Sequence, residues 1–277
     1  MKISVISLFR DSEKTIHECL HRLEQLEIST DATFEYSFYE NDSVDNTKMI
    51  LEEWLKSRDG YLISETLGAP KFSSTSSQQR NELMCYYRNK SLNSIKPMDS
   101  DYVVVFDSDV GFDENIINDY IPFLEDGVVM VTPNVLQNIN CKMFDSTKRS
   151  YYDSYALIDQ DMNNGMTWSS NPFYRAEDRE KWDSGLPVSV KSAFGGFVMI
   201  RSEAMNRSSW KTDGHCEHWG LCSDLLKFGK ILIIPEIITT VEHDQTIIAS
   251  ISEDNINKVI NFQHQHLNDK YLSKQPT

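Results

Sequence analysis

The stretch YVVVFDSDVGF, residues 102–112, joins a run of apolar residues to two closely spaced carboxylates. The apolar residues 102–106 predict a buried strand, and this strand ends directly at Asp107 and Asp109. A carboxylate that is buried without a partner costs several kcal/mol, so both side chains need a cation or hydrogen-bond donors. Because ligands of open α/β sheets bind beyond the carboxyl ends of the strands, this position suits a ligand site.

Two explanations of the aspartate pair follow from its spacing. Positions i and i+2 across a turn let Asp107 and Asp109 face one divalent cation, and their hard oxygen atoms suit Mg²⁺ or Mn²⁺. A cation held there would offset the charge of a bound diphosphate. Alternatively, the pair forms turn hydrogen bonds that cap a helix beginning near Asp113. The motif by itself leaves both explanations open.

Strands and helices alternate on both sides of this motif in the first half of the chain. Apolar and β-branched runs predict strands at 2–9, 34–40, 61–65, 102–106 and 127–132. Helical spacing of apolar residues predicts helices at 13–27, around 50–55, at 80–95 and near 113–124. Such alternation is typical of an α/β fold, in which a mostly parallel central sheet carries helices on both faces.

The second half of the chain is less regular. Residues 140–192 are rich in aromatic and turn residues, and after them we expect a strand at 194–200, a helix within 218–228 and a strand at 231–235. Apolar residues at helical spacing predict a further helix beyond residue 253. Since the sequence contains no repeat and no long linker, we expect one domain over 1–250 and a helical tail at 251–277.

Composition and charge limit the classes of partner. The chain has 277 residues and a net charge of −15, which disfavours binding to nucleic acids or to anionic lipid. Five cysteines without a CxxC pair indicate reduced thiols and an intracellular protein. No signal peptide is recognisable, and no apolar run approaches the roughly 20 residues that a transmembrane helix needs. We therefore expect a soluble cytoplasmic protein, whose oligomeric state the sequence leaves open.

Several segments, taken in order, resemble a known family. The first strand, the acidic turn ENDSVDNT, an Arg-Asn helix and the strand ending in DxD resemble the Rossmann-like GT-A fold of nucleotide-sugar glycosyltransferases. More narrowly, YYRNKSL, VVVFDSDVGF, YYDSYALID and PVSVKSAFGGFVMI resemble the cryptococcal capsule α-1,3-mannosyltransferase family. The resemblance covers roughly residues 1–245, and it implies a single GT-A domain with a nucleotide-binding half at 1–135 and an acceptor half at 136–250.

The resemblance implies roles for residues on the nucleotide side. Glu40 and Asp42, in the acidic turn, would lie near the base and ribose, with Phe9 and Arg10 beside them at the end of the first strand. Arg88 would approach the nucleotide and supply a fixed cation. The alternative for Arg88 is a surface ion pair, which has little effect on stability.

The resemblance also implies a metal site and a sugar site. Asp107 and Asp109 match the DxD motif, with Asp109 the better ligand for Mn²⁺ or Mg²⁺, and His243 matches a metal-binding histidine. The alternative for His243 is a structural histidine at a strand end. Gly195 and Gly196 would lie near the donor sugar and the acceptor, since glycine allows close approach of the backbone to a ligand.

Glu217 is the candidate catalytic base. Glu217 matches the glutamate of a Glu-Asp pair of the fold, but His218 stands where the aspartate usually is. Alternatively, Glu217 is an acidic residue that stabilises the start of a helix. Tyr152 and Asp153 are assigned to the acceptor side, and Trp219 offers its ring either to a sugar or to the core.

These residues together predict a metal-dependent glycosyltransferase. It would move a sugar, mannose in the family, from a GDP- or UDP-sugar to a hydroxyl of a glycan or glycoconjugate, with Asp109 holding the metal. In-line attack assisted by Glu217 would invert the anomeric centre, whereas the family resemblance implies retention. Two alternatives are a catalytically degenerate domain that binds sugar nucleotide or a partner, and a phosphatase with Asp107 as its nucleophile.

Overall fold

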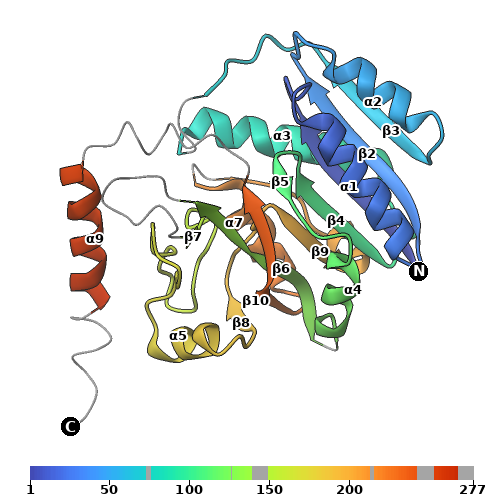
Figure 1. Cartoon of the computed structure of the whole chain (residues 1–277). Coiled ribbons are helices and arrows are strands. Elements are labelled where there is room, and N and C mark those ends of the chain that lie inside the picture. The colour runs from blue at the N-terminus through green and yellow to red at the C-terminus, as the bar shows by residue number, and fades with distance from the viewer. Residues whose placement is uncertain (73–75, 126, 139–148, 213–214, 242–252, 268–277) are drawn as a thin grey trace.

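A computed structural model of the chain describes residues 1–72, 76–125, 127–138, 149–212, 215–241 and 253–267 (Figure 1). Its centre is one sheet with the strand order β3-β2-β1-β4-β9-β6-β10-β5, while β7 pairs with β6 and β8 pairs with β10. The strands are β1 Lys2–Phe9, β2 Thr33–Asn41, β3 Gly60–Glu65, β4 Tyr102–Asp107, β5 Val110–Gly111, β6 Val128–Asn138, β7 Arg149–Tyr151, β8 Val188–Val190, β9 Phe197–Arg201 and β10 Lys230–Val241.

Six of these strands run in the same direction. β1 is parallel to β2 and β4, β2 is parallel to β3, and β6 is parallel to β10. β9 is antiparallel to both β4 and β6, so β6 and β10 share the direction of the first four strands. The predicted α/β fold with a mostly parallel sheet is therefore confirmed. In this register Leu8 lies opposite Asp107 and Phe9 lies opposite Glu40, which gathers the carboxyl ends of the strands at one edge.

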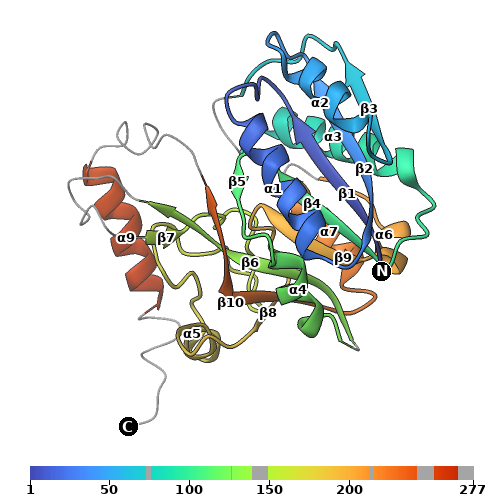
Figure 2. The ribbon, with the colours of Figure 1, turned by 45° about the vertical axis from the view of Figure 1, so that its right-hand side comes forward.

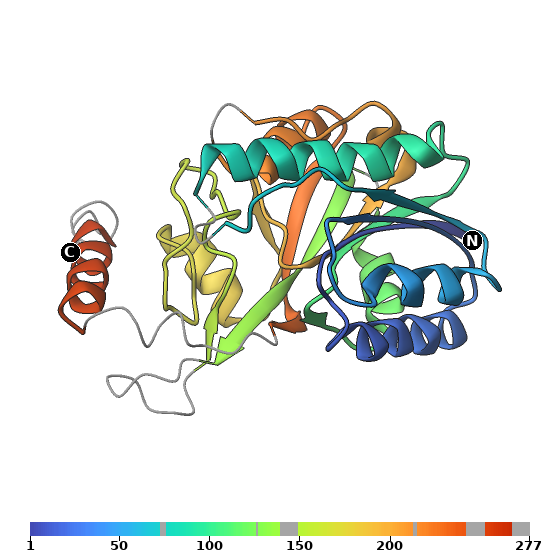
Figure 3. The same ribbon diagram turned by 90° about the horizontal axis from the view of Figure 1, so that it is seen from above.

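Helices cover both faces of the sheet, as Figures 2 and 3 show. One apolar core forms between the sheet and helices α1, α2 and α4, and a second forms between the sheet and helices α3, α6 and α7. The helices are α1 Ile16–Ser29, α2 Thr47–Leu55, α3 Gln78–Ile95, α4 Ile116–Tyr120, the 3₁₀ helix η1 Ile121–Phe123, α5 Ala176–Asp183, α6 Ser202–Asn206, α7 Glu217–Leu225 and α9 Glu253–Leu267.

Three predicted elements have different bounds in the structure. The helix expected near 113–124 is a short α4 followed by a 3₁₀ turn, because Pro122 has no N–H to continue the α-helical pattern. The strand expected at 194–200 begins at Phe197, because Gly195 and Gly196 have positive φ and form a turn. β10 extends well past the expected 231–235, with a register shift against β6 between Ile234 and Ile238.

The short elements β5, β7, β8, α5 and α6 were not predicted. Two- and three-residue strands contain too few positions to show a period of two, so tertiary pairing decides them. The tail helix α9 forms where a helix was expected, and the amide of Gln263 makes two hydrogen bonds to the backbone of Thr167. The division of the chain at residues 135 and 250 stays a prediction. Within the described residues, no helix has the length and apolar character needed to cross a membrane.

Candidate active site

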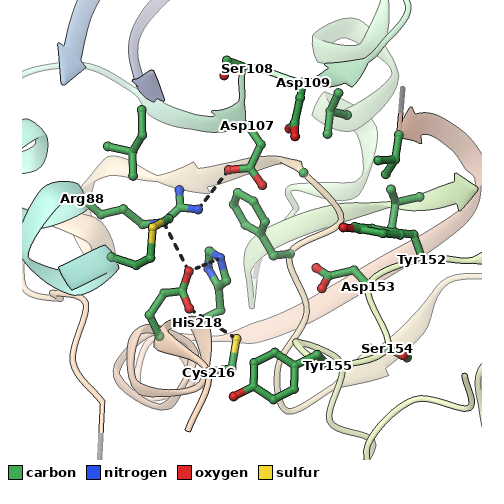
Figure 4. A pocket seen from close by; sticks show the side chains of 18 of the residues that line it. Arg88, Asp107, Ser108, Asp109, Tyr152, Asp153, Ser154, Tyr155, Cys216 and His218 are labelled. Carbon is green, nitrogen blue, oxygen red and sulfur yellow. Dashed lines mark hydrogen bonds and ion pairs between the residues drawn. The ribbon is translucent and has the colours of Figure 1, made fainter. Parts of the chain in front are cut away.

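Two adjoining cavities open at the carboxyl edge of the sheet. The first has a volume of about 440 Å³ and is walled by the end of β4, one face of α3 and the segments 152–155 and 216–218 (Figure 4). The second has a volume of about 630 Å³ and lies against the ends of β1 and β2. Leu8, Arg80, Met84 and Asp109 line both cavities. The carboxylate of Asp109, the second aspartate of the DxD motif, therefore lies where the two cavities meet.

Asp107 is the last residue of β4, and its carboxylate faces the first cavity. Oδ1 accepts a hydrogen bond from Nη2 of Arg88 over 3.0 Å. Burial raises the pKa of Asp107, Arg88 opposes this effect, and the charge of Asp109 adds to the increase, so the net shift is upward. The turn before α4 is hydrogen-bonded by Asp113, whose Oδ1 accepts from the Asn115 N–H over 2.9 Å. The side-chain hydrogen bond of this turn therefore comes from Asp113 rather than from Asp107 or Asp109.

Arg88 is a buried cation at the floor of the first cavity. Its side chain is 2% exposed, and its guanidinium lies 3.0 Å from Asp107 Oδ1 and 3.8 Å from Glu217 Oε1. Burial acts to lower the pKa of Arg88, but the two carboxylates raise it above its ordinary value, so it stays charged. The group also lies over Phe194 at 4.9 Å and near Trp210 at 5.9 Å. Among the described residues, Nε and Nη1 have no hydrogen-bond partner.

Glu217 begins α7 and points into the same buried cluster. Burial acts to raise the pKa of Glu217, but nearby positive charge, including that of Arg88 and Arg80, lowers it more, so the carboxylate stays ionised. Oε1 lies 3.6 Å from Nε2 of His218, and Oε2 accepts from Sγ of Cys216 over 3.8 Å. Burial lowers the pKa of His218 to about 3, so this imidazole is neutral. Its ring stacks on Phe194 with centroids 3.9 Å apart.

Asp153 faces the first cavity from the loop that follows β7, opposite Arg88 and His218 in Figure 4. Its Oδ2 accepts the Gly195 N–H over 2.9 Å. Burial raises the pKa of Asp153 to about 6, because the backbone N–H donors compensate only part of the lost hydration and Asp107 adds repulsion. The cavity therefore contains a carboxylate that titrates close to neutral pH.

The glycine turn between Phe194 and β9 explains the FGG motif. Gly195 and Gly196 have φ values of +68° and +74°, which residues with a Cβ rarely adopt. A Cβ at Gly195 would lie 2.9 Å from Pro133, and one at Gly196 would lie 2.5 Å from a methyl group of Val110. Gly196 lines the first cavity, and Gly195 instead gives its N–H to Asp153.

The acidic turn after β2 has a structural use for both of its predicted carboxylates. Glu40 accepts from the Ser43 N–H over 2.8 Å and from the Ser64 hydroxyl over 2.7 Å. Asp42 accepts three backbone N–H groups from the loop 67–69, over 2.7, 2.8 and 3.0 Å. Neither residue lines either of these two cavities. Their contact with a base or ribose stays a prediction, and in the structure Asp42 fixes the loop that leads to the second cavity.

Phe9 and Arg10 line the second cavity, and their position beside a nucleotide stays a prediction. Arg10 donates from Nη2 to the carbonyl of Ala69 over 2.7 Å and from Nη1 to that of Pro70 over 3.3 Å. Asn41 at the end of β2 lines the same space and was not predicted. The loop 67–72 is thus attached from two sides, by Asp42 and by Arg10.

The residues expected on the acceptor side divide into two groups. Tyr152 and Asp153 line the first cavity, whereas Trp219 does not. The indole of Trp219 donates to the Tyr155 carbonyl over 3.2 Å and stacks on His215 with centroids 4.9 Å apart. His243 lies outside the described residues, so its predicted role as a metal ligand stays a prediction.

Several residues of the cavities were missed by sequence reasoning. Arg80, Met84 and Arg88 repeat at intervals of four on α3, which places all three on one face of the helix. This spacing was a usable signal for Arg80 and Met84. Phe194 gave no such signal, since its apolar neighbours predict a strand rather than a turn beside a ligand site.

The side chains of this site could supply only some of the ligands that a divalent cation needs. Within the described chain, no three side chains of His, Cys, Asp or Glu are grouped to hold a metal ion. Asp107 and Asp109 would supply carboxylate oxygens, and phosphate oxygens and water commonly complete such a site for Mg²⁺. The repulsion between the two carboxylates, which raises the pKa of Asp107, is the feature that a bound cation would compensate.

Solved structures share this fold at low sequence identity. The structure of S. aureus TarS 1–349 is 14% identical with a TM-score of 0.50, and covers 97% of this chain and 72% of its own. The complex of that protein with UDP-GlcNAc has 15% identity and a TM-score of 0.52, with coverages of 95% and 65%. The Pyrobaculum calidifontis mannosyltransferase PcManGT with GDP-Man and Mn²⁺ has 12% identity and a TM-score of 0.54, with coverages of 96% and 69%. These likenesses confirm the predicted GT-A type of fold.

A family match covers nearly the whole chain. The family described as Cryptococcal mannosyltransferase 1 matches residues 3–268. No curated protein matches the sequence. The matched span includes β1 from its second residue, the DxD motif at the end of β4, the FGG turn and Glu217. The chain belongs to the Cryptococcal mannosyltransferase 1 family and is a glycosyltransferase.

Proposed function

We propose that this glycosyltransferase is metal-dependent and transfers mannose from GDP-mannose to a hydroxyl group of a glycan or glycoconjugate. One observation carries the proposal. Two adjoining cavities share Asp109 and Arg80, and the buried cation Arg88 lies in the wall of the first. A nucleotide sugar is a long ligand with its diphosphate in the middle, so it matches two spaces that meet at charged residues.

In this arrangement the nucleoside occupies the second cavity. Phe9, Phe72 and Tyr87 offer apolar and aromatic surface there, and the side chain of Asn41 offers hydrogen-bonding groups. The sugar occupies the first cavity, beside Asp153 and the glycine turn. The diphosphate lies between them, near Asp109 and Arg80, where both cavities are lined by the same residues.

The charges of the first cavity support metal dependence. Among the described residues, its lining includes four carboxylates, Asp107, Asp109, Asp153 and Glu217, and two guanidinium groups. Such a site repels a diphosphate unless positive charge is added. A cation held by Asp107 and Asp109 would neutralise the diphosphate and stabilise the departing nucleotide. Arg88 opposes the rise in the pKa of Asp107 and holds this carboxylate in place through a hydrogen bond.

The choice of donor is supported by the family and by one structural neighbour. The family is described as mannosyltransferase, and PcManGT was solved with GDP-Man and Mn²⁺. The same fold holds UDP-GlcNAc in TarS, so the fold alone does not select the base. For this reason the test compares both nucleotide classes.

The proposal is tested by thermal unfolding of the wild type and Asp109→Ala with GDP-mannose or UDP-sugars, with and without Mn²⁺. A ligand at 100 times its dissociation constant stabilises the native state by about 2.7 kcal/mol, which raises Tm by several degrees. We expect this increase for GDP-mannose only when Mn²⁺ is present, and its loss in Asp109→Ala. Asp119→Ala, at an exposed position on α4, is the matched control and keeps the increase.

Transfer is then measured with mannosides as acceptors. Product formation that requires Mn²⁺ supports the proposal. Binding of GDP-mannose without any product on a broad acceptor panel would favour the degenerate domain, and the absence of any nucleotide-dependent increase in Tm would contradict the proposed donor.

A further inference from the structure

The second cavity contains a carboxylate that the binding of the diphosphate and its cation does not use. Asp11, two residues after the end of β1, lines this cavity and does not line the first. The other carboxylate in the lining, among the described residues, is Asp109, which lines both cavities and lies where the diphosphate is proposed. Asp11 therefore belongs to the part of the wall that the nucleoside would contact.

The acidic turn after β2 fixes the position of Asp11. The φ angle of Asp11 is +49°, a value that residues with a Cβ adopt infrequently. Its N–H donates to the Ser43 hydroxyl over 3.0 Å, and its Oδ1 accepts the Val44 N–H over 2.8 Å. Both partners belong to the turn, so the turn holds the main chain and one carboxylate oxygen of Asp11 in place.

The other carboxylate oxygen has a partner that a ligand can displace. Oδ2 of Asp11 lies 2.5 Å from Nζ of Lys71, and both residues line the second cavity. The Lys71 side chain is 69% exposed, whereas the Asp11 side chain is 16% exposed. An ion pair with a long, exposed lysine contributes little to stability, so the ammonium group can turn to a ligand at low cost. The same lysine lowers the pKa of Asp11, which keeps the carboxylate ionised.

This ion pair places a hydrogen-bond acceptor directly beside a donor. An ionised carboxylate only accepts hydrogen bonds, and an ammonium group only donates them. Guanine has the complementary order on one edge, where the exocyclic amine and a ring N–H donate side by side and the neighbouring carbonyl oxygen accepts. Uracil has a ring N–H between two carbonyl oxygens, so one of these oxygens would be repelled by a carboxylate that accepts the N–H.

On the basis of the proposed function, we propose that Asp11 and Lys71 select guanine as the base of the donor nucleotide. The Asp11 carboxylate accepts the ring N–H and the exocyclic amine, and the Lys71 ammonium group donates to the adjacent carbonyl oxygen. A carboxylate oxygen can accept more than one hydrogen bond, so Oδ1 keeps the Val44 N–H. The fold holds UDP-GlcNAc in TarS, so the choice of base has to come from side chains such as these.

The first test uses the wild type and needs no variant. Binding of GDP, inosine diphosphate (IDP) and UDP is measured by calorimetry in the presence of Mn²⁺. IDP differs from GDP only in lacking the exocyclic amine, so the ratio of the two dissociation constants isolates the hydrogen bond from that amine. We expect IDP to bind about 10- to 100-fold more weakly than GDP, the usual effect of losing a hydrogen bond to a charged group, and UDP to bind more weakly still.

The second test exchanges the acceptor for a donor. In Asp11→Asn one carboxylate oxygen is replaced by an amide NH₂, so the variant is expected to bind GDP and IDP equally. It should also bind xanthosine diphosphate more tightly than the wild type does, because xanthine has a carbonyl oxygen where guanine has the amine. Lys71→Ala should weaken GDP and IDP by the same factor, since both bases keep the carbonyl oxygen that Lys71 would contact.

Asp42→Asn is the matched control for this region. Asp42 fixes the loop 67–69, which precedes Lys71, but it lines neither of the two cavities. A shift of this loop would weaken GDP and IDP alike, so the ratio of their dissociation constants should stay at the wild-type value. Asp31→Asn, at an exposed position, is the surface control and should change neither constant.

Several outcomes overturn the inference and leave the proposed transferase intact. Equal binding of GDP and IDP by the wild type is one, and it decides the question even if Asp11→Asn does not fold. A preference for GDP over IDP that persists in Asp11→Asn, or that is lost in Asp42→Asn alone, is another. If Asp11→Asn instead loses the discrimination between GDP and its deoxyribose form, Asp11 contacts the ribose and not the base.

Failure of the proposed function gives different results. Tighter binding of UDP than of GDP by the wild type would contradict the proposed donor together with the inference. A wild type that binds no nucleotide in the presence of Mn²⁺ would contradict the proposed function itself, and the inference would fail with it.

Discussion

Asp42 and Asp153 are aspartates at the same edge of the sheet, and the protein treats them in opposite ways. Asp42 accepts three backbone N–H groups and the amide of Asn41, which outweigh burial and lower its pKa to about 2. Asp153 has fewer donors and faces other carboxylates, and its pKa is about 6. A fully hydrogen-bonded carboxylate contributes to stability, whereas an under-compensated one reduces stability and remains available for chemistry.

The contrast extends to the two cavities. The second cavity is bounded by the loop 67–72, which Asp42 and Arg10 fix through backbone groups. The first cavity is built from side chains that carry charge, with the buried Arg88 between Asp107 and Glu217. One half of the site is therefore shaped by satisfied hydrogen bonds, and the other by a cluster in which several charges share one cation.

The largest effect should follow from removing that cation. Arg88→Ala leaves the buried Glu217 and the partly exposed Asp107 without the cation that they share, and breaking a buried pair costs up to about 3–5 kcal/mol. We expect a decrease of this size in the free energy of unfolding, measured in urea at pH 7.5, and loss of donor binding. Arg88→Lys keeps the charge but not the planar guanidinium group. Its free energy of unfolding should therefore lie between those of the wild type and Arg88→Ala.

A decrease of less than about 1 kcal/mol in Arg88→Ala would show that water or conformational change compensates the carboxylates. In that case the charges of the first cavity do not depend on Arg88 for their stability. The contrast with the fully hydrogen-bonded Asp42 would then no longer hold.

The sequence predicted the strands and the sheet that position this site better than it predicted the contacts between the side chains of the site. The apolar run ending at Asp107 placed a carboxylate at the carboxyl end of a central strand, and the alternation of strands and helices gave the mostly parallel sheet. Both inferences rest on local patterns that a chain segment carries by itself. Phe9 and Arg10 came instead from the family resemblance, and in the structure they line the second cavity at and just after the end of β1.

The arrangement of charges was not predictable, because it depends on tertiary contacts. The sequence of residues 78–95 does not show that Arg88 is buried between carboxylates, while the side chain of Lys90 is 42% exposed and lies 3.1 Å from Glu65. The pairing of Arg88 with Glu217 joins α3 to α7, far apart in the sequence. The N–H groups that donate to Asp42 belong to the loop 67–69, and this loop comes close to Asp42 only in the folded protein.

A smaller effect is expected at the satisfied carboxylate. Asp42→Asn replaces an ionised acceptor by an amide that has one acceptor oxygen, so at least one N–H of the loop 67–69 loses its charged partner. Hydrogen bonds to charged groups contribute about 1.5–3 kcal/mol, and partial exposure reduces this, so we expect a loss of about 2 kcal/mol at pH 7. Asp31→Asn, at an exposed position, is the control.

The pH dependence of that loss tests its cause. A carboxylate whose pKa is lower in the folded state than its ordinary value of 3.8 stabilises the protein above that value, and the contribution disappears as pH falls through about 2. The difference between wild type and Asp42→Asn should therefore shrink between pH 5 and pH 2.5. A difference that stays constant over this range would assign the loss to packing of the loop rather than to charge.

The smallest effect, and the one of opposite sign, is expected for stability at Asp153. Its pKa in the folded state, about 6, lies above the ordinary 3.8, so the native state binds the proton more tightly than the unfolded chain. Stability contributed by this group is present below pH 4 and is lost as pH rises through 6. Asp153→Asn removes the charge but keeps an oxygen that can accept the Gly195 N–H.

We therefore expect Asp153→Asn to be more stable than the wild type by about 1 kcal/mol at pH 8, after allowance for contact with cavity water, and equal to it near pH 4. Urea unfolding at the two pH values measures the difference. Greater stability combined with lost transfer would mean that the carboxylate is kept for chemistry at the expense of stability. A variant that is less stable at pH 8 would instead place Asp153 with Asp42, as a carboxylate whose hydrogen bonds hold the fold, because only a compensated charge stabilises the native state when it is ionised.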